Sequence, residues 1–202
     1  MNYRVHTATS TSHLESNAVL RNTYALLGMT LLFSAVVAWG SMILRLPHPG
    51  LLLTMVGFYG LYYLVNKYST RALGVVFTFL FTGFLGYTLG PILGMVIRSS
   101  SIGYEILGMS LAATGVIFLS LSAYVLTTSK NFSYMGGMLF VGSIIAMLAA
   151  FASILMPSIM MMVVVSAVFA LISSGYILFH TSEIIHGGET NYIMATVALY
   201  VS

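Results

Sequence analysis

Long uncharged runs, separated by single charged residues, constrain this chain more than any other feature of its sequence. Charged side chains make up 5% of its 202 residues, whereas about a quarter of the residues of a soluble domain are charged. The charged residues are Arg4, Glu15, Arg21, Arg45, Lys67, Arg71, Arg98, Glu105, Lys130, Glu183 and Glu189. Each apolar run between them is a candidate membrane crossing, so the chain is predicted to lie in a lipid bilayer.

The lengths of these runs predict an all-α, polytopic membrane protein. A hydrocarbon core of about 30 Å needs roughly 20 helical residues. Pro47 and Pro49 place the start of a second helix near Gly50, and Pro157 divides the uncharged stretch 131–182 into two helices. We expect one transmembrane domain over 22–202, with helices at about 22–44, 50–66, 72–97, 105–128, 134–155 and 159–185, and a partial helix at 191–202.

The last apolar run, 190–202, is too short to cross a bilayer. At 1.5 Å per residue, its 13 residues form a helix of about 20 Å. The segment is therefore either re-entrant or the first part of a longer helix. The sequence Glu189-Thr190-Asn191 is typical of a helix start, and nothing closes the other end, which favours a truncated seventh helix.

The first 21 residues are rich in serine and threonine and lack an apolar pattern, which predicts a disordered polar tail over 1–21. The basic residues predict the orientation of the chain. With the N-terminus in the cytoplasm, the inner segments hold Arg4, Arg21, Lys67, Arg71 and Lys130, and the outer segments hold Arg45 and Arg98. This bias towards the inner side predicts a cytoplasmic N-terminus.

Missing residue types and motifs exclude several functions. The chain has no aspartate for aspartyl proteolysis, and no cysteine for disulfides, thiolate zinc sites or cysteine nucleophiles. Its basic residues are scattered and form no nucleic-acid-binding patch. No Gly-x-Ser-x-Gly elbow, His-Glu-x-x-His pair or P-loop occurs. We therefore expect no enzyme activity, no catalytic residue, no cofactor, no metal site and no nucleic-acid partner.

A strip of small residues marks the third predicted helix. Gly86, Gly90 and Gly94 follow one another at intervals of four residues, so they share one helix face, and Pro91 lies among them. Two interpretations are open. Pro91 frees a carbonyl in the preceding turn and creates a hinge or a polar cavity lining, or the strip serves tight helix packing with a tolerated kink.

Polar chemistry concentrates at the end of the sixth predicted helix. His180, Glu183 and His186 are three residues apart, so a carboxylate would lie between two imidazoles on one helix face. This arrangement could sense or relay protons, and it is a weak ligand set for a divalent metal. The alternative is an interfacial helix end, in which Gly187-Gly188 forms the C-cap and Glu183 is solvated.

Two segments carry a family resemblance. "TGFLGYTLGP" (82–91) and "SSGYILFHTSEIIHGGETNYIMATVALYVS" (173–202) resemble the signature regions of the Bax inhibitor family of small membrane proteins. The resemblance implies seven helices, six of which surround a central seventh. The chain is most similar to a proteobacterial inner-membrane branch, whose members are described as modulators of a membrane-anchored AAA-type protease. It therefore implies an inner-membrane location and that protease as a partner, besides the lipid bilayer.

Other family members are described as pH-sensitive calcium leaks that a pair of aspartates closes. At the corresponding positions this chain has His180 and Ser202, neither of which is acidic. This departure predicts little calcium flux at neutral pH, and a residual leak that falls as the pH drops through about 6 to 7. The resemblance leaves two functions: a protease modulator and, as the alternative, a pH-modulated leak for calcium or protons.

Overall fold

A computed structural model describes the backbone of residues 3–128 and 130–202, with side chains from residue 17 onwards. The described part of the chain folds into seven α-helices without a β-strand, which confirms the predicted fold class. The helices are α1 (Tyr3–Ile43), α2 (Gly50–Tyr68), α3 (Ala72–Ser99), α4 (Gly103–Thr128), α5 (Met135–Leu155), α6 (Ile159–Ile185) and α7 (Tyr192–Val201). Pro49 immediately precedes α2, and Pro157 lies in the α5–α6 turn.

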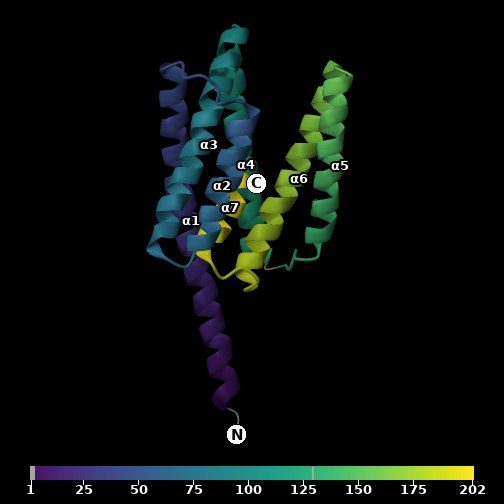
Figure 1. Ribbon diagram of the computed structural model, residues 1–202. Helices are drawn as coiled ribbons and strands as arrows, with labels where there is room; N and C mark the ends of the chain where they lie inside the picture. Colours follow the sequence, from purple (N-terminus) through teal and green to yellow (C-terminus); the bar gives the residue numbers. More distant parts are fainter. Residues whose placement is uncertain (1–2, 129) are drawn as a thin grey trace.

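Helix α1 begins much earlier than the sequence predicts. The segment expected to form a disordered tail over 1–21 is described from Tyr3 as the start of α1, and it extends beyond the bundle (Figure 1). Glycine and proline are both absent from the sequence before Gly28, so nothing in that segment interrupts helical backbone geometry. The part of α1 that is apolar enough to cross a membrane is Asn17–Ile43.

The helices form a bundle in which α7 occupies an inner position (Figure 1). Helix α3 packs against α1 and α2, and α4 packs against α3 and α6. Among the described residues, α7 contacts α1, α2, α3 and α6, whereas α5 packs against α6 alone. Of the six helices expected to surround the seventh, four therefore contact it. Helix α4 packs against α3 and α6 instead, and α5 lies on the outer side of α6 (Figure 1).

Five of the described helices are long and apolar enough to cross a membrane, namely α1 from Asn17, α3, α4, α5 and α6. This finding makes the chain a multi-pass membrane protein by length and composition. The sequence also predicts that α2 crosses the membrane. Helix α2 is not among the five, because several tyrosines and the polar pair Asn66-Lys67 lower the hydropathy of its second half.

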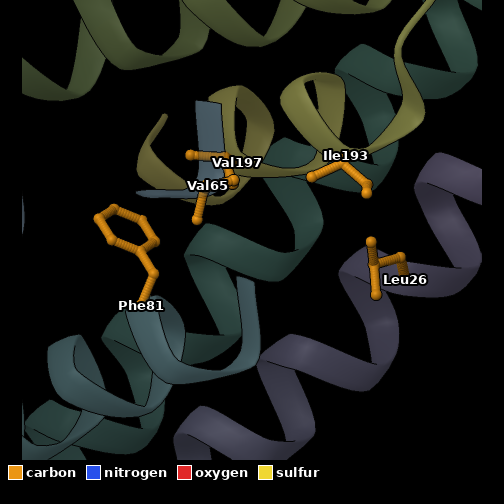
Figure 2. Close-up of a cluster of buried hydrophobic side chains, with 5 residues drawn as sticks. All are labelled: Leu26, Val65, Phe81, Ile193 and Val197. Atoms are coloured by element: carbon orange, nitrogen blue, oxygen red, sulfur yellow. The ribbon is translucent and has the colours of Figure 1, made fainter. Parts of the chain in front are cut away.

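The buried core is small, and α7 lies at its centre. One cluster joins Leu26 of α1, Val65 of α2 and Phe81 of α3 to Ile193 and Val197 of α7 (Figure 2). A second cluster contains Leu27, Ile184, Ala195 and Leu199. Both clusters include side chains of α1 and α7. Since lipid is as apolar as these side chains, close packing contributes more to their association than the exclusion of water does.

Candidate functional site: a polar cavity between α2, α6 and α7

A cavity of about 730 Å³ lies between the aromatic face of α2, the second half of α6 and the length of α7. Helix α2 lines it with Phe58, Tyr59 and Tyr62. Most of the remaining lining is apolar, and its imidazole and carboxylate groups lie near the end of α6 and the start of α7. Three of the four predicted polar site residues line this cavity: His180, Glu183 and Ser202.

His180 is half-buried on the inner face of α6 among aromatic rings. Its imidazole stacks on the Tyr176 ring, with 5.7 Å between ring centroids and 16° between ring planes. The Phe179 ring meets it edge-on at 5.1 Å. Tyr176 in turn accepts a hydrogen bond from Ser143 Oγ of α5 at 3.2 Å, which links the histidine's stacking partner to the neighbouring helix.

Glu183 is half-buried one turn further along α6, where the chain reverses direction. Ser133 Oγ, from the α4–α5 connection, donates a hydrogen bond to Glu183 Oε1. The backbone N–H groups of Gly188 and Glu189 donate to the Glu183 carbonyl at 2.8 and 3.2 Å. A Cβ at Gly188 would clash with the Glu183 carboxylate, so any larger residue there would require this side chain to move. Glu183 is thus held in the cavity wall rather than solvated.

His186 does not share the environment of the other two residues. It is exposed, it caps the end of α6, and it is not among the residues that line the cavity. Its Nδ1 lies 2.9 Å from the Ser182 carbonyl and 3.3 Å from Ser182 Oγ. Gly187 follows with a φ of 76°, which turns the chain out of the helix as expected for a C-cap glycine. The structure therefore separates His186 from His180 and Glu183, although the sequence predicts all three on one helix face.

The structure places a further carboxylate in the cavity lining, that of Glu189, which the sequence predicts only as part of a helix start. Glu189 lines the same cavity as Glu183, because the turn after α6 brings it back towards the bundle. Its Oε1 accepts a hydrogen bond from the Asn191 N–H at 2.7 Å, and Asn191 Oδ1 caps α7 by accepting from the N–H of Ile193 at 2.9 Å. The Gly187-Gly188 pair permits this turn, and it is the feature of the sequence that could have indicated the position of Glu189.

Ser202 lies on the α7 wall of the cavity. Its hydroxyl donates to the Ala198 carbonyl at 2.7 Å, so it is satisfied within its own helix. Within the described part of the chain, no three histidine or acidic side chains come close enough to hold a metal ion. The cavity is therefore lined by one imidazole, two carboxylates and several serine and tyrosine residues on a largely aromatic and aliphatic wall.

The glycine strip of α3 lies elsewhere, against α1. A Cβ at Gly86 would lie 2.4 Å from the Ser34 carbonyl, and one at Gly90 would lie 2.5 Å from the Ala38 carbonyl. At Gly94 a Cβ would be 3.4 Å from the Met42 side chain of α1. The strip thus accompanies a close approach of two helix backbones, as the packing interpretation describes.

Pro91 is buried within an uninterrupted α3. A proline has no N–H to donate to the carbonyl four residues earlier, which here belongs to Tyr87. Ser41 Oγ of α1 donates to that carbonyl at 3.0 Å. Gly90 makes this possible, because a Cβ there would lie 2.8 Å from Ser41 Oγ. The carbonyl freed by the proline is therefore occupied by a neighbouring helix and does not line the polar cavity between α2, α6 and α7.

Comparisons with known proteins place the whole bundle in one family. Residues 16–202 match the family described as "Inhibitor of apoptosis-promoting Bax1". The chain is 52% identical to "Modulator of FtsH protease YccA" of Escherichia coli K12 over 192 residues, which cover 95% of this chain and 87% of that protein. It is 47% identical to an uncharacterized protein of Pseudomonas aeruginosa over 188 residues, covering 93% of this chain and 84% of that one.

The chain is also 52% identical to "Inner membrane protein YccA" of E. coli O6:H1 over 192 residues. The match covers 95% of this chain and 87% of that protein. No solved structure matches this chain. The family match spans the helical bundle together with the polar cavity and the glycine strip. This chain belongs to the Bax inhibitor family.

Proposed function

We propose that this chain is a non-enzymatic protein of a bacterial inner membrane that modulates a membrane-bound protease of the FtsH kind. The observation that carries this proposal is its 52% identity, over 95% of its length, to the E. coli protein named for that role. Other relatives are named only as membrane or uncharacterized proteins, so the proposal depends on this likeness.

The shape of α1 supports the proposal. Its first turns extend beyond the bundle (Figure 1). Among the described side chains, which start at residue 17, Val19 and Leu20 are the first to pack against a buried cluster. A protease that pulls membrane proteins from the bilayer needs a stretch of chain outside the fold on which to begin. A cytoplasmic N-terminus, which the basic residues favour, would present this stretch on the side of the membrane where ATP is available.

The direct test is crosslinking and co-purification from native membranes. We would express this chain in E. coli lacking its own relative, isolate it in mild detergent, and measure FtsH in the eluate together with the half-life of a second FtsH substrate. We expect FtsH to co-purify and the half-life of that substrate to change. Absence of FtsH from the eluate, with an unchanged substrate half-life, would overturn the proposal.

Deletion of residues 2–16 tests the role of the projecting segment. The deletion keeps every described side chain of the buried clusters, so the melting temperature should stay unchanged. The turnover of the chain itself, or its effect on the second substrate, should change. The exposed substitution Glu105→Gln, at the start of α4, is the control that should leave both unaffected. An unchanged half-life and unchanged protease output in the deletion strain would count against the segment as the point of engagement.

A cation leak is the second candidate function, and one observation favours it. The cavity brings the carboxylates of Glu183 and Glu189 to one wall together with His180, although neither carboxylate occupies the aspartate positions of the leak-type relatives. Carboxylates that line a cavity within a membrane protein are suited to an ion path. The pair thus supplies the cavity with acidic groups that His180 and Ser202 do not provide.

Calcium flux into vesicles separates the two functions. A protease modulator should give no flux above that of empty vesicles at neutral pH. A leak through the cavity should be reduced by Glu183→Gln combined with Glu189→Gln, and not by the exposed control Glu105→Gln. Flux that the double substitution abolishes would promote the leak to the primary function.

A further inference from the structure

A second, basic cavity lies at the opposite end of the bundle from the projecting part of α1. It has a volume of about 290 Å³ and is lined by residues from the ends of α1 and α3. Figure 1 shows these two helix ends at the same end of the bundle. Arg45 follows α1, His48 belongs to the α1–α2 connection, and Arg98 is in the last turn of α3. Residues more than 50 positions apart in the sequence thus line one small cavity.

Arg45 adopts a backbone conformation that favours glycine. Its φ is 51°, and it is the only residue other than glycine with a positive φ in the described part of the chain. The Arg45 N–H donates to the Met42 carbonyl at 3.2 Å and the Leu46 N–H donates to the Ser41 carbonyl at 3.1 Å, which is the Schellman pattern of a helix end. Glycine would occupy this position with less strain, so the arginine side chain has a use that outweighs its backbone cost.

The positive charge of this cavity is not neutralised by the protein. No acidic side chain lines it, and within the described residues neither Arg45 nor Arg98 has an ion-pair partner. His48 Nδ1 accepts a hydrogen bond from the Gly50 N–H at 3.0 Å, so the proton of the neutral ring is on Nε2. The wall of the cavity is mainly apolar, and Arg45, His48 and Arg98 are exposed residues around it. Their two guanidinium groups and the imidazole N–H, all of them donors, are thus available to an anion at the mouth of the cavity.

The depth of the cavity identifies the kind of anion. It forms at the ends of two helices that are long and apolar enough to span a membrane, which is the level of lipid phosphates. The side chains beside it are exposed and apolar: Leu44 is 70% exposed, Met95 60% and Ile92 45%. An acyl chain can lie along these side chains while its phosphate contacts the arginines.

We propose that Arg45, His48 and Arg98 form a site for the phosphate of an anionic phospholipid headgroup. The phosphate accepts hydrogen bonds from both guanidinium groups, which suit phosphate oxygens because their N–H donors form a planar fork. His48 adds a third donor. The lipid joins the end of α1 to the end of α3 at the point where the glycine strip finishes. This inference rests on the geometry of the cavity and is independent of the proposed protease partner.

The test uses the full chain, purified in detergent, with three probes: phosphatidylglycerol, phosphatidylcholine and inorganic phosphate. We expect phosphatidylglycerol to raise the melting temperature and to remain bound in native mass spectra, and phosphatidylcholine to do neither. Arg98→Gln should weaken phosphatidylglycerol binding about tenfold, the effect of losing one charge-assisted contact. Arg71→Gln, which removes an exposed charge at the other end of the bundle, is the matched control and should bind like the wild type.

Arg45→Gly separates binding from folding. Since the backbone at this position favours glycine, the variant should be at least as heat-stable as the wild type without lipid, yet it should lose most of the lipid-induced rise. Equal responses to the two lipids, or unchanged responses in both arginine variants, would overturn the proposal. An equal shift with millimolar inorganic phosphate would assign the site to a free anion and also overturn the lipid proposal.

Discussion

Gly90 lies where α1 and α3 approach each other closely, next to the hydrogen bond from Ser41 to the Tyr87 carbonyl. A Cβ there would lie 2.5 Å from the Ala38 carbonyl and 2.7 Å from Ser41 Cβ, neither of which can move without shifting the α1 backbone. Glycine on a helix interior is otherwise unfavourable by roughly 1 kcal/mol relative to alanine. Its presence indicates that the close helix contact stabilises the fold by more than this.

Substitution of this glycine should therefore destabilise the bundle. Gly90→Ala is expected to lower the free energy of unfolding by about 1–3 kcal/mol, the usual cost of overpacking. Gly115 of α4 has nothing within 4 Å of its virtual Cβ, so Gly115→Ala is the matched control and should be neutral or slightly stabilising. Thermal unfolding of the purified variants in one detergent measures both. Equal melting temperatures for the two variants would show that α1 and α3 can move apart to accommodate the added methyl group at little cost.

The bond between Ser41 and the Tyr87 carbonyl allows a second prediction at this scale. Ser41→Ala should leave the carbonyl unpaired in a buried contact and cost about 1–3 kcal/mol. In a Pro91→Ala background, the restored N–H can bond the same carbonyl, so the cost of Ser41→Ala should shrink. The four proteins form a double-mutant cycle, in which a coupling energy above about 0.5 kcal/mol is expected. Strictly additive effects would mean that the serine acts independently of the proline.

At the scale of helices, α7 is held by hydroxyl groups as well as by apolar packing. The Tyr200 hydroxyl lies 2.5 Å from Ser34 Oγ of α1 and donates to the Thr82 carbonyl of α3 at 3.4 Å. Thr196 Oγ1 contacts the Thr23 carbonyl of α1 at 3.3 Å. A short helix thus makes polar bonds to two longer ones, which fixes its rotation and turns Ala198 and Ser202 towards the cavity.

Removal of the Tyr200 hydroxyl should loosen this attachment. Tyr200→Phe is expected to cost about 0.5–1.5 kcal/mol, the usual net value of such a bond. Tyr63→Phe is the control, because Tyr63 is 61% exposed on α2. Unfolding curves in detergent compare the two. A Tyr200→Phe protein as stable as the control would indicate that the apolar clusters alone hold α7.

Helix ends were largely predictable from the sequence, and the sources of error are physical. Prolines and isolated charges punctuate the chain around α2, α3 and α6, so those elements begin or end close to such residues. The start of α1 was not predictable from polarity, because a serine- and threonine-rich segment without glycine or proline can be helical as well as unstructured. The crossing expected for α2 is not supported by its composition, since its tyrosines and the pair Asn66-Lys67 lower its hydropathy.

The candidate site was predictable only in part. Spacing along α6 placed His180 and Glu183 on related faces, and both line the cavity. Spacing also suggested His186, but the helix ends at Ile185 and the backbone turns away. Glu189 could not be found from helical periodicity, because it reaches the cavity through a glycine turn that lies outside the helix and is held by local hydrogen bonds with Asn191 and Glu183.

For the whole molecule, the two ends of the bundle differ in charge. The N-terminal part of α1 and the α2–α3, α4–α5 and α6–α7 connections lie at one end, and the connections that follow α1 and α3 lie at the other (Figure 1). Lys67, Arg71 and Lys130 therefore belong to the first end, and Arg45 and Arg98 to the second. This segregation agrees with the basic bias from which a cytoplasmic N-terminus is predicted.

Cysteine labelling tests that orientation directly, because the chain contains no cysteine. We expect a cysteine at the exposed Ser101, after α3, to react with an impermeant reagent added from outside the inner membrane. A cysteine at the exposed Thr70, before α3, should react only after the inner membrane is permeabilised. The opposite pattern would reverse the orientation, and it would also put the projecting end of α1 outside the reach of a cytoplasmic ATPase.

The pairing of α1 with α3 has a mechanical consequence. Force applied at the projecting end of α1 acts along the helix axis, so it loads the contacts opposite Gly86, Gly90 and Gly94 in shear and all at once. Contacts that must break together resist force better than contacts that open one after another. Extraction from this end would then be slow, because forced unfolding is governed by the height of the unfolding barrier. A protein of this construction would occupy a pulling machine for longer than a loosely packed one.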